Sequence, residues 1–174
     1  MLKDNPRNLA ALNLANEKAN WSKPLPAGRF RGISVHGCFG CFVAQVIEIS
    51  IDTNKKIHVH RVVCAIDCGL AINPDGVKAQ MESEIVYGLT AALYGEITFE
   101  NGKVKQSNFN DYRMLRMNEM PVIQVSIVPS KENRAVPENM VCNLEPPTLA
   151  NAIFAATGKR IHELPLHTED LGKA

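Results

Sequence analysis

One glutamine, Gln80, lies beside the apolar stripe of a predicted long helix. Asn73-Pro74 predicts the start of a helix, because asparagine caps free backbone N–H groups and proline suits the first helical position. Gln80 follows one turn later, at the edge of an apolar stripe, and Glu84 and Tyr87 continue its flank. Its amide can both donate and accept hydrogen bonds. The position alone favours the interpretation that Gln80 lies at the half-exposed boundary between the apolar and polar faces of the helix, without a functional role.

Two carboxylates lie in a proline-marked segment near the C-terminal end. Glu138 follows Val136-Pro137, and Glu145 lies between Leu144 and Pro146-Pro147. A positioned carboxylate can act as a general base. An isolated loop carboxylate is more commonly solvated, and the sequence by itself favours that interpretation for both.

The cysteines allow a metal site as one alternative. Cys38-x-x-Cys41 and Cys64-x-x-x-Cys68 together provide four thiols, the number that a structural zinc requires. Cys41 lies at the start of a predicted strand and Cys64 lies within one, whereas zinc ligand pairs usually lie on tight turns. This placement favours the interpretation that Cys38, Cys41 and Cys64 are small, buried apolar residues. The total of five cysteines is odd, which argues against a disulfide framework. Free thiols favour a reducing, cytoplasmic compartment, although the sequence leaves the localisation otherwise open.

Periodicity predicts the elements that must position these side chains. A helix is expected over 7–19 and an irregular connector over Lys23–Gly32. Alternating apolar residues predict strands over Phe42–Ile51 and Ile57–Ile66, joined as a hairpin. The long helix extends from Pro74 towards Gly95. Further on we expect a hairpin around Asn101-Gly102, a strand at Val122–Val128, a loop at Ser130–Pro147 and a short helix at Leu149–Thr157.

This order of elements predicts an α+β fold in which β-hairpins and a mixed sheet pack against one long helix and a short C-terminal helix. The 174 residues are expected to form a single domain, with 1–32 as helix and connector and 33–174 as the α+β core. A net charge of +1 argues against a nucleic-acid partner. No apolar run is long enough for a membrane span, and the N-terminus does not have the pattern of a signal peptide.

Several motifs, in order along almost the whole chain, resemble one enzyme family. They are Cys38-Phe39-Gly40-Cys41-Phe42-Val43-Ala44, then Asp67-Cys68-Gly69-Leu70-Ala71-Ile72-Asn73-Pro74, and finally Leu149–Leu166. The family is the large, molybdopterin-binding subunit of the molybdenum hydroxylases, which include xanthine dehydrogenase and aldehyde oxidase. Within it, the chain looks most like the isoquinoline 1-oxidoreductase beta-subunit type, and it would be the C-terminal part of such a subunit.

The resemblance implies a chemistry and two site residues. The family hydroxylates N-heterocycles or aldehydes with oxygen from water, at a molybdenum–pterin centre. Gln80, in Gln80-Met81-Glu82-Ser83, falls on the family's pterin-binding glutamine. Glu138 is the best match to its general base, although the glycine-flanked loop of the family is replaced here by Pro137-Glu138-Asn139. No protein metal ligand is expected in this chain.

The resemblance also implies an incomplete enzyme. Ser83-Glu84 stands where the family has small residues, usually two glycines, and a glutamate would obstruct close backbone approach. The upstream half of the cofactor domain and the cysteines for iron–sulfur clusters are missing from the sequence. We therefore expect the cofactor in a complete enzyme but none on this chain alone. The expected partners are the upstream half and an iron–sulfur subunit. The alternatives are a folded, non-catalytic binding or interaction protein, which could form a homo-oligomer through its exposed apolar surface, and a small zinc-binding module.

Overall fold

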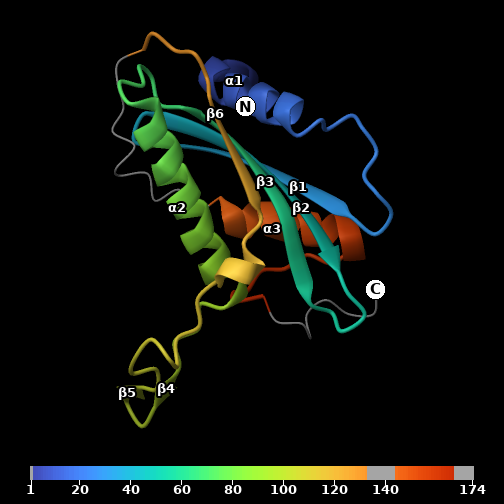
Figure 1. Ribbon diagram of the computed structural model, residues 1–174, viewed down its shortest axis with the longest axis vertical. Coiled ribbons are helices and arrows are strands. Elements are labelled where there is room, and N and C mark those ends of the chain that lie inside the picture. Colours follow the sequence, from blue (N-terminus) through green and yellow to red (C-terminus); the bar gives the residue numbers. More distant parts are fainter. Residues whose placement is uncertain (1, 133–143, 167–174) are drawn as a thin grey trace.

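A four-stranded mixed sheet forms the centre of the molecule in the computed structural model, which describes residues 2–132 and 144–166 (Figure 1). Its strands are β1 (Phe30–Cys38), β2 (Cys41–Ile51), β3 (Ile57–Asp67) and β6 (Val122–Ile127), in the order β1-β2-β3-β6. The first three pair antiparallel, and β6 pairs parallel with β3. The predicted α+β class with a mixed sheet is confirmed.

Helices cover both faces of this sheet. Helix α1 (Pro6–Lys18) packs on one face, while α2 (Pro74–Leu93) and α3 (Glu145–Thr157) pack on the other. Alternation along β2 makes this arrangement possible, because Val43 and Ile47 point towards α2 and α3 whereas Ala44 and Val46 point towards α1. The same residues were expected on opposite faces from the sequence.

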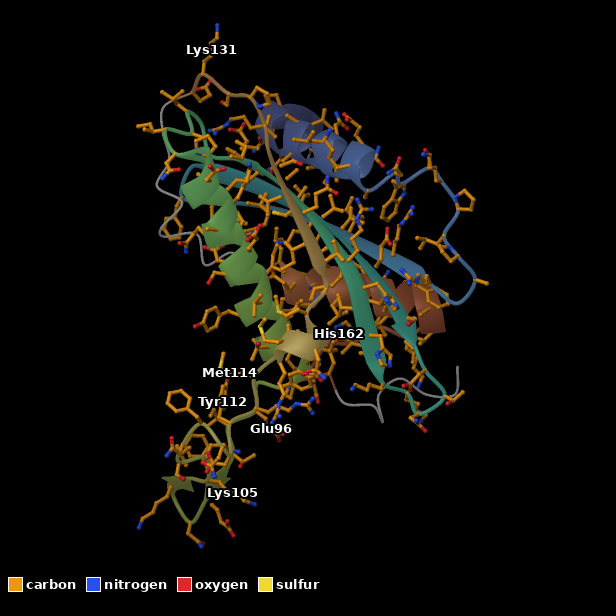
Figure 2. The ribbon with its side chains drawn as sticks, viewed as in Figure 1. Glu96, Lys105, Tyr112, Met114, Lys131 and His162 are labelled. Atoms are coloured by element: carbon orange, nitrogen blue, oxygen red, sulfur yellow. The ribbon has the colours of Figure 1, made fainter. Side chains whose placement is uncertain are left out.

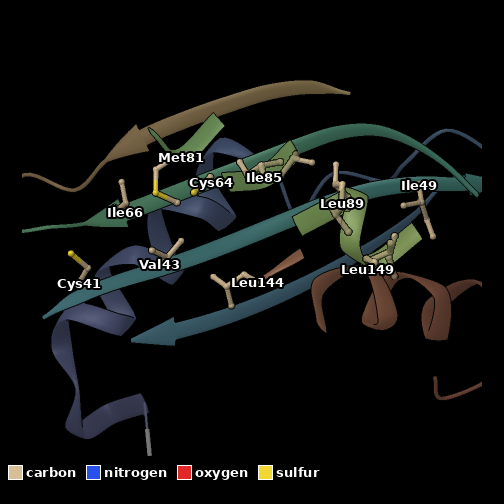
Figure 3. Packing of buried hydrophobic residues seen from close by; sticks show 14 of the residues in the cluster. Cys41, Val43, Ile49, Cys64, Ile66, Met81, Ile85, Leu89, Leu144 and Leu149 are labelled. Carbon is tan, nitrogen blue, oxygen red and sulfur yellow. The ribbon is translucent and has the colours of Figure 1, made fainter. Parts of the chain in front are cut away.

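The larger core lies between the sheet and the pair α2 and α3 (Figure 3). Val77, Met81, Ile85, Leu89 and Ala92 form the buried stripe of α2, as the periodicity predicted. They meet Cys64 and Ile66 of β3. This part of β3 is apolar on both faces, as is typical of a strand that helices cover on both sides. Asn73 caps α2 by accepting a hydrogen bond from the Gly76 backbone N–H at 3.0 Å.

One strand was missed and one boundary differs from the prediction. Strand β1 was not predicted, and it occupies part of the expected connector, which ends before Phe30 rather than at Gly32. Strand β1 is difficult to predict from the sequence, because it is an edge strand that contains glycine, serine and histidine and has few fully buried residues. Helix α3 begins at Glu145, inside the expected loop, with Pro146 and Pro147 in its first turn.

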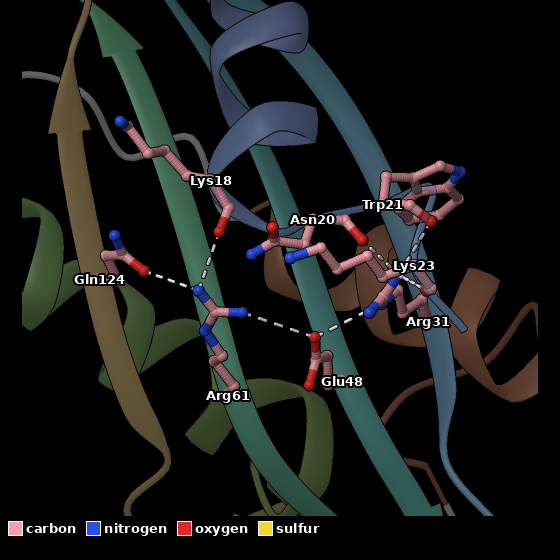
Figure 4. Close-up of polar contacts among 8 residues, drawn as sticks. All are labelled: Lys18, Asn20, Trp21, Lys23, Arg31, Glu48, Arg61 and Gln124. Carbon is pink, nitrogen blue, oxygen red and sulfur yellow. Dashed lines mark hydrogen bonds and ion pairs between the residues drawn. The ribbon is translucent and has the colours of Figure 1, made fainter. Parts of the chain in front are cut away.

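Polar contacts attach α1 and the following connector to the sheet. Arg7 donates two hydrogen bonds to Asp67, at 2.9 and 2.7 Å. At the other end of α1, Arg61 donates to the Lys18 carbonyl at 2.9 Å and lies 3.7 Å from Glu48, which also accepts from Arg31 (Figure 4). The division of the chain into a 1–32 segment and a 33–174 core stays a prediction, although α1 shares a buried cluster with β2 and β3.

The predicted second hairpin is present but short. Its strands β4 (Phe99–Glu100) and β5 (Lys103–Val104) pair only with each other and extend away from the rest of the molecule (Figure 1). Two 3-10 helices complete the described elements, η1 (Leu2–Asp4) and η2 (Met117–Glu119).

Candidate functional site

Gln80 lies half-buried on α2 and already has a partner within the chain. Its Nε2 donates to Oε1 of Glu84 at 3.4 Å, one turn further along the helix. This contact uses one amide N–H and leaves the second N–H and the amide oxygen. Gln80 therefore retains donor and acceptor capacity for a ligand edge.

Glu84 contributes a second polar atom at the same place. Its Oε2 is buried and has no hydrogen-bond partner among the described residues. Burial raises the pKa of this carboxyl, and the hydrogen bond from Gln80 opposes the rise. A buried carboxyl oxygen without a partner is costly, so this position favours either the protonated acid or a ligand that brings a donor.

Glu145 departs from its sequence interpretation. It was expected as a solvated loop carboxylate, but it is 1% exposed in the first turn of α3. Gln45 Nε2, from β2, donates to its Oε1 at 2.9 Å, and its Oε2 has no partner among the described residues. Burial raises its pKa to about 7, and the charge of Glu84 contributes to that rise.

The close approach of α2 and α3 buries this carboxyl. A Cβ at Gly88 would lie 2.1 Å from Oε2 of Glu145, so any side chain at this position would displace the carboxyl group from its observed place. Gln45 Nε2 also lies 4.0 Å from Sγ of Cys64, whose pKa burial raises. The sequence did contain a signal for this cluster, because Gln45 interrupts the core-facing residues Val43 and Ile47.

Glu138, the expected general base, lies outside the described residues, as does Cys142. The structure therefore does not test whether Glu138 approaches Gln80, and its role stays a prediction.

The zinc alternative receives no support from the part of the chain that the structure describes. No group of three or more His, Cys, Asp and Glu side chains is placed there to hold a metal ion. Cys41 and Cys64 are buried free thiols, Cys68 is also buried, and burial raises the pKa of Cys41 to about 11. Cys38 is disulfide-bonded, so the expectation of free thiols throughout is wrong for that residue.

Comparison with known proteins shows first the fold and then the family. The fold of this chain is shared with solved oxidoreductases. Quinoline 2-oxidoreductase from Pseudomonas putida 86 matches 75% of this chain with a TM-score of 0.67 at 18% identity, and the match covers 18% of that structure. Aldehyde oxidoreductase from Desulfovibrio desulfuricans also matches 75% of the chain, with a TM-score of 0.65 at 22% identity, and the match covers 15% of that structure.

The family follows from the sequence match. The molybdopterin cofactor-binding domain model matches residues 16–121, which include Gln80 and Glu84 and make up more than half of the chain. The chain belongs to this family.

Two curated relatives extend the match to nearly the whole chain. The beta subunit of isoquinoline 1-oxidoreductase from Brevundimonas diminuta is 32% identical over 95% of the chain. A nicotinate dehydrogenase subunit from Pseudomonas putida is 28% identical over 94%. The chain spans 22% of the first relative's length and 15% of the second. Separately, none of the described helices is long and apolar enough to cross a membrane.

Proposed function

We propose that this chain is the C-terminal part of the large subunit of a molybdopterin-dependent oxidoreductase, and that it is active only together with the upstream half of that subunit. The reaction class is hydroxylation of an N-heterocycle or an aldehyde with oxygen from water. One observation carries the proposal: the family match over residues 16–121 includes the half-buried Gln80 on α2.

The described residues fit the hydrogen-bonding requirements of a pterin edge. Gln80 retains an N–H and an oxygen. Glu84, which the sequence predicted to obstruct close backbone approach, has a buried Oε2 without a partner among the described residues, so it also offers a hydrogen-bonding atom at this place. A pterin presents donors and acceptors that match such a pair. When bound, the molybdenum–pterin group supplies the redox chemistry. This chain would orient one pterin edge through Gln80 and hold a proton at Glu84.

Glu138 is the residue we propose as general base. In the completed enzyme it would accept a proton during attack on the substrate carbon. An iron–sulfur subunit would receive the electrons. The assignment of Glu138 rests on its place shortly before the final helix, since Pro137-Glu138-Asn139 replaces the glycine-flanked loop of the family. The iron–sulfur subunit is implied by the family resemblance.

Metal analysis tests the proposal most directly. The chain should be isolated under native conditions from its own cells, together with whatever binds it, and assayed for molybdenum. Near-stoichiometric molybdenum in the complex is the expected result. The absence of molybdenum from the complex or the isolated chain would instead support the second candidate function, a non-catalytic binding protein. The Gln80–Glu84 hydrogen bond favours this candidate, because it occupies one N–H of the amide that would bind the cofactor.

Substitutions then test the two residues in the complete complex. Glu138→Gln should lower kcat by about 100-fold or more, since general-base catalysis contributes about 10²–10⁴-fold. Gln80→Ala should reduce the pterin content of the purified complex. Glu82→Gln, an exposed position on the same helix, is the matched control and should change neither quantity.

A further inference from the structure

Strand β6 forms one edge of the central sheet, next to β3 (Figure 3). The Val128 backbone N–H donates to the Ile66 carbonyl at 2.7 Å, so it points towards β3. Because backbone groups alternate along a strand, the N–H and C=O groups of Ile123, Val125 and Ile127 point the other way, towards the open edge. Among the described residues, β3 is the only strand that pairs with β6. The outward donors and acceptors are therefore a template for one further strand.

The other edge strand, β1, is protected against such pairing. Asn151 of α3 donates to the Ile33 carbonyl at 2.9 Å, and α3 packs closely over Gly32 of the same strand. Strand β1 also carries a charged residue, Arg31. A covering helix and a charged side chain are two of the devices by which natural sheets prevent pairing at an edge. The sheet is therefore much more open to a further strand at β6 than at β1.

The sequence of β6 lacks these protective features. No charged residue lies between Glu119 and Lys131, and Figure 2 shows Lys131 beyond the end of the strand rather than along it. Pro121 and Pro129 lie just outside the strand, so they limit the segment that can pair without interrupting it. The register with β3 is regular throughout, without a bulge. A regular, uncharged edge strand of this kind favours pairing with another strand.

A largely apolar groove of about 470 Å³ lies beside this edge, between α2 and the beginning of β6. Its apolar walls are formed by Ala79, Val86, Met120, Pro121 and Ile123, and Glu82 is its charged residue. Tyr87, next to Val86 on α2, is 62% exposed. The side chains of Ile123, Val125 and Ile127 pack against the same core as α2 and are only partly buried. A strand paired with β6 would extend this core and cover the groove side of α2.

We infer that β6 pairs antiparallel with β6 of a second copy of this chain, which joins the two sheets across a two-fold axis. An axis at Val125 places this residue opposite its own copy and Ile123 opposite Ile127 of the second copy. All of these residues direct their backbone groups to the open edge, so each opposed pair exchanges both N–H···O=C bonds. Their side chains are β-branched and uncharged, whereas like charges opposed across the axis would repel. The strand therefore matches itself, as a two-fold interface requires.

Sedimentation equilibrium and amide hydrogen exchange of the purified chain test this dimer together. The mass should rise from 19.2 kDa towards twice that value as the protein concentration increases. The outward N–H groups of Ile123, Val125 and Ile127 should exchange slowly only where the dimer forms, whereas those of Gln124 and Ser126, which face β3, should exchange slowly throughout. A monomer at every concentration would overturn the pairing. So would a dimer in which the outward N–H groups exchange quickly, or their protection in a monomer, which would show that another segment of the same chain covers β6.

A pair of charge variants supplies the quantitative test. Ser126→Lys introduces a cation into both copies of β6 near the axis, and it should raise the dissociation constant of the dimer about tenfold or more, since lysine on an edge strand is a common natural barrier to pairing. Ser22→Lys adds the same charge at an exposed position of the connector and should leave the dissociation constant unchanged. Circular dichroism establishes that both variants are folded. An equally stable dimer of folded Ser126→Lys would contradict pairing through β6; if that variant does not fold, the exchange pattern of the wild type decides.

Discussion

The buried Glu145 lies in an unusual environment for a carboxyl group. Gln45 donates a hydrogen bond to one of its oxygens, and Gly88 leaves just enough space for the other. Removing a carboxylate from water favours the neutral form, which is why its pKa rises to about 7. The charge of Glu84 adds a smaller effect of the same sign.

We predict that Glu145 makes the folded state less stable as pH rises. Between the ordinary pKa of 4.5 and the folded pKa of about 7, the folded state binds more protons than the unfolded state. The free energy of unfolding should therefore fall across this range and level off above it, by about 3 kcal/mol since one pKa unit corresponds to about 1.4 kcal/mol. Glu145→Gln should remove most of that fall.

Thermal unfolding between about pH 4 and 9 brackets this titration and measures the effect. The Glu145→Gln variant should gain stability over the wild type as pH rises, whereas Glu82→Gln, at an exposed position, should follow the wild type. Equal pH slopes in the wild type and Glu145→Gln would show that Glu145 does not titrate in this range.

At the scale of elements, close backbone approach fixes β1 against α3. A Cβ at Gly32 would lie 2.1 Å from the Thr148 carbonyl oxygen and 2.4 Å from the Ala152 backbone nitrogen. Backbone atoms of a helix cannot move aside as the end of a side chain can. The strand β1 can therefore approach α3 this closely only because Gly32 has no side chain.

We predict that Gly32→Ala destabilises the fold by about 1–3 kcal/mol or more, the usual cost of overpacking. Gly37→Ala on the same strand is the matched control, because its Cβ would meet the Phe42 ring, at 2.8 Å, rather than helix backbone. Urea denaturation should show a clearly lower midpoint for Gly32→Ala than for Gly37→Ala. Similar midpoints would mean that β1 and α3 separate easily.

The attachment of α1 depends on a different interaction. Arg7 holds the pKa of Asp67 below its ordinary value, mainly through their hydrogen bonds, and Asp67 is 2% exposed. The pair therefore stabilises the fold above the ordinary pKa of about 3.8, and this stabilisation is lost as pH falls through the lower folded pKa.

We predict that Arg7→Met costs about 3 kcal/mol at neutral pH, because it leaves a buried carboxylate without its cation. The difference from wild type should shrink towards about pH 3, where protonation relieves that charge. Lys18→Met, which removes only an exposed ion pair with Glu17, should cost less than about 1 kcal/mol. A pH-independent difference between Arg7→Met and wild type would point to lost packing alone, for instance against Phe42.

At the scale of the whole molecule, residues 96–113, which include β4 and β5 and are called the arm below, lie outside the buried core. The buried clusters contain no residue of the arm, and its strands pair only with each other. The arm should therefore contribute little to the stability of the isolated chain.

We predict that replacing residues 97–112 with a short Gly-Ser linker leaves the thermal midpoint within a few degrees of wild type, since no core residue is removed. Circular dichroism and thermal unfolding of the shortened chain measure this. A collapse of the cooperative transition would show that the arm is part of the folding unit, and Tyr94→Phe, which keeps the arm but loses a hydrogen bond at its base, serves for comparison.

The sequence by itself determined the family, the long helix with Gln80 and the strands β2 and β3, because these features depend on local periodicity, capping and contiguous motifs. Tertiary structure decided the rest. Strand β1 is an edge strand in which Gly32 fits against α3. Glu145 is buried because α3 begins at this residue, just before the two prolines, and packs over Gly88. Burial and contacts depend on segments that are far apart in sequence, such as those that carry Gln45 and Glu145. A local sequence pattern cannot predict which distant segments come into contact.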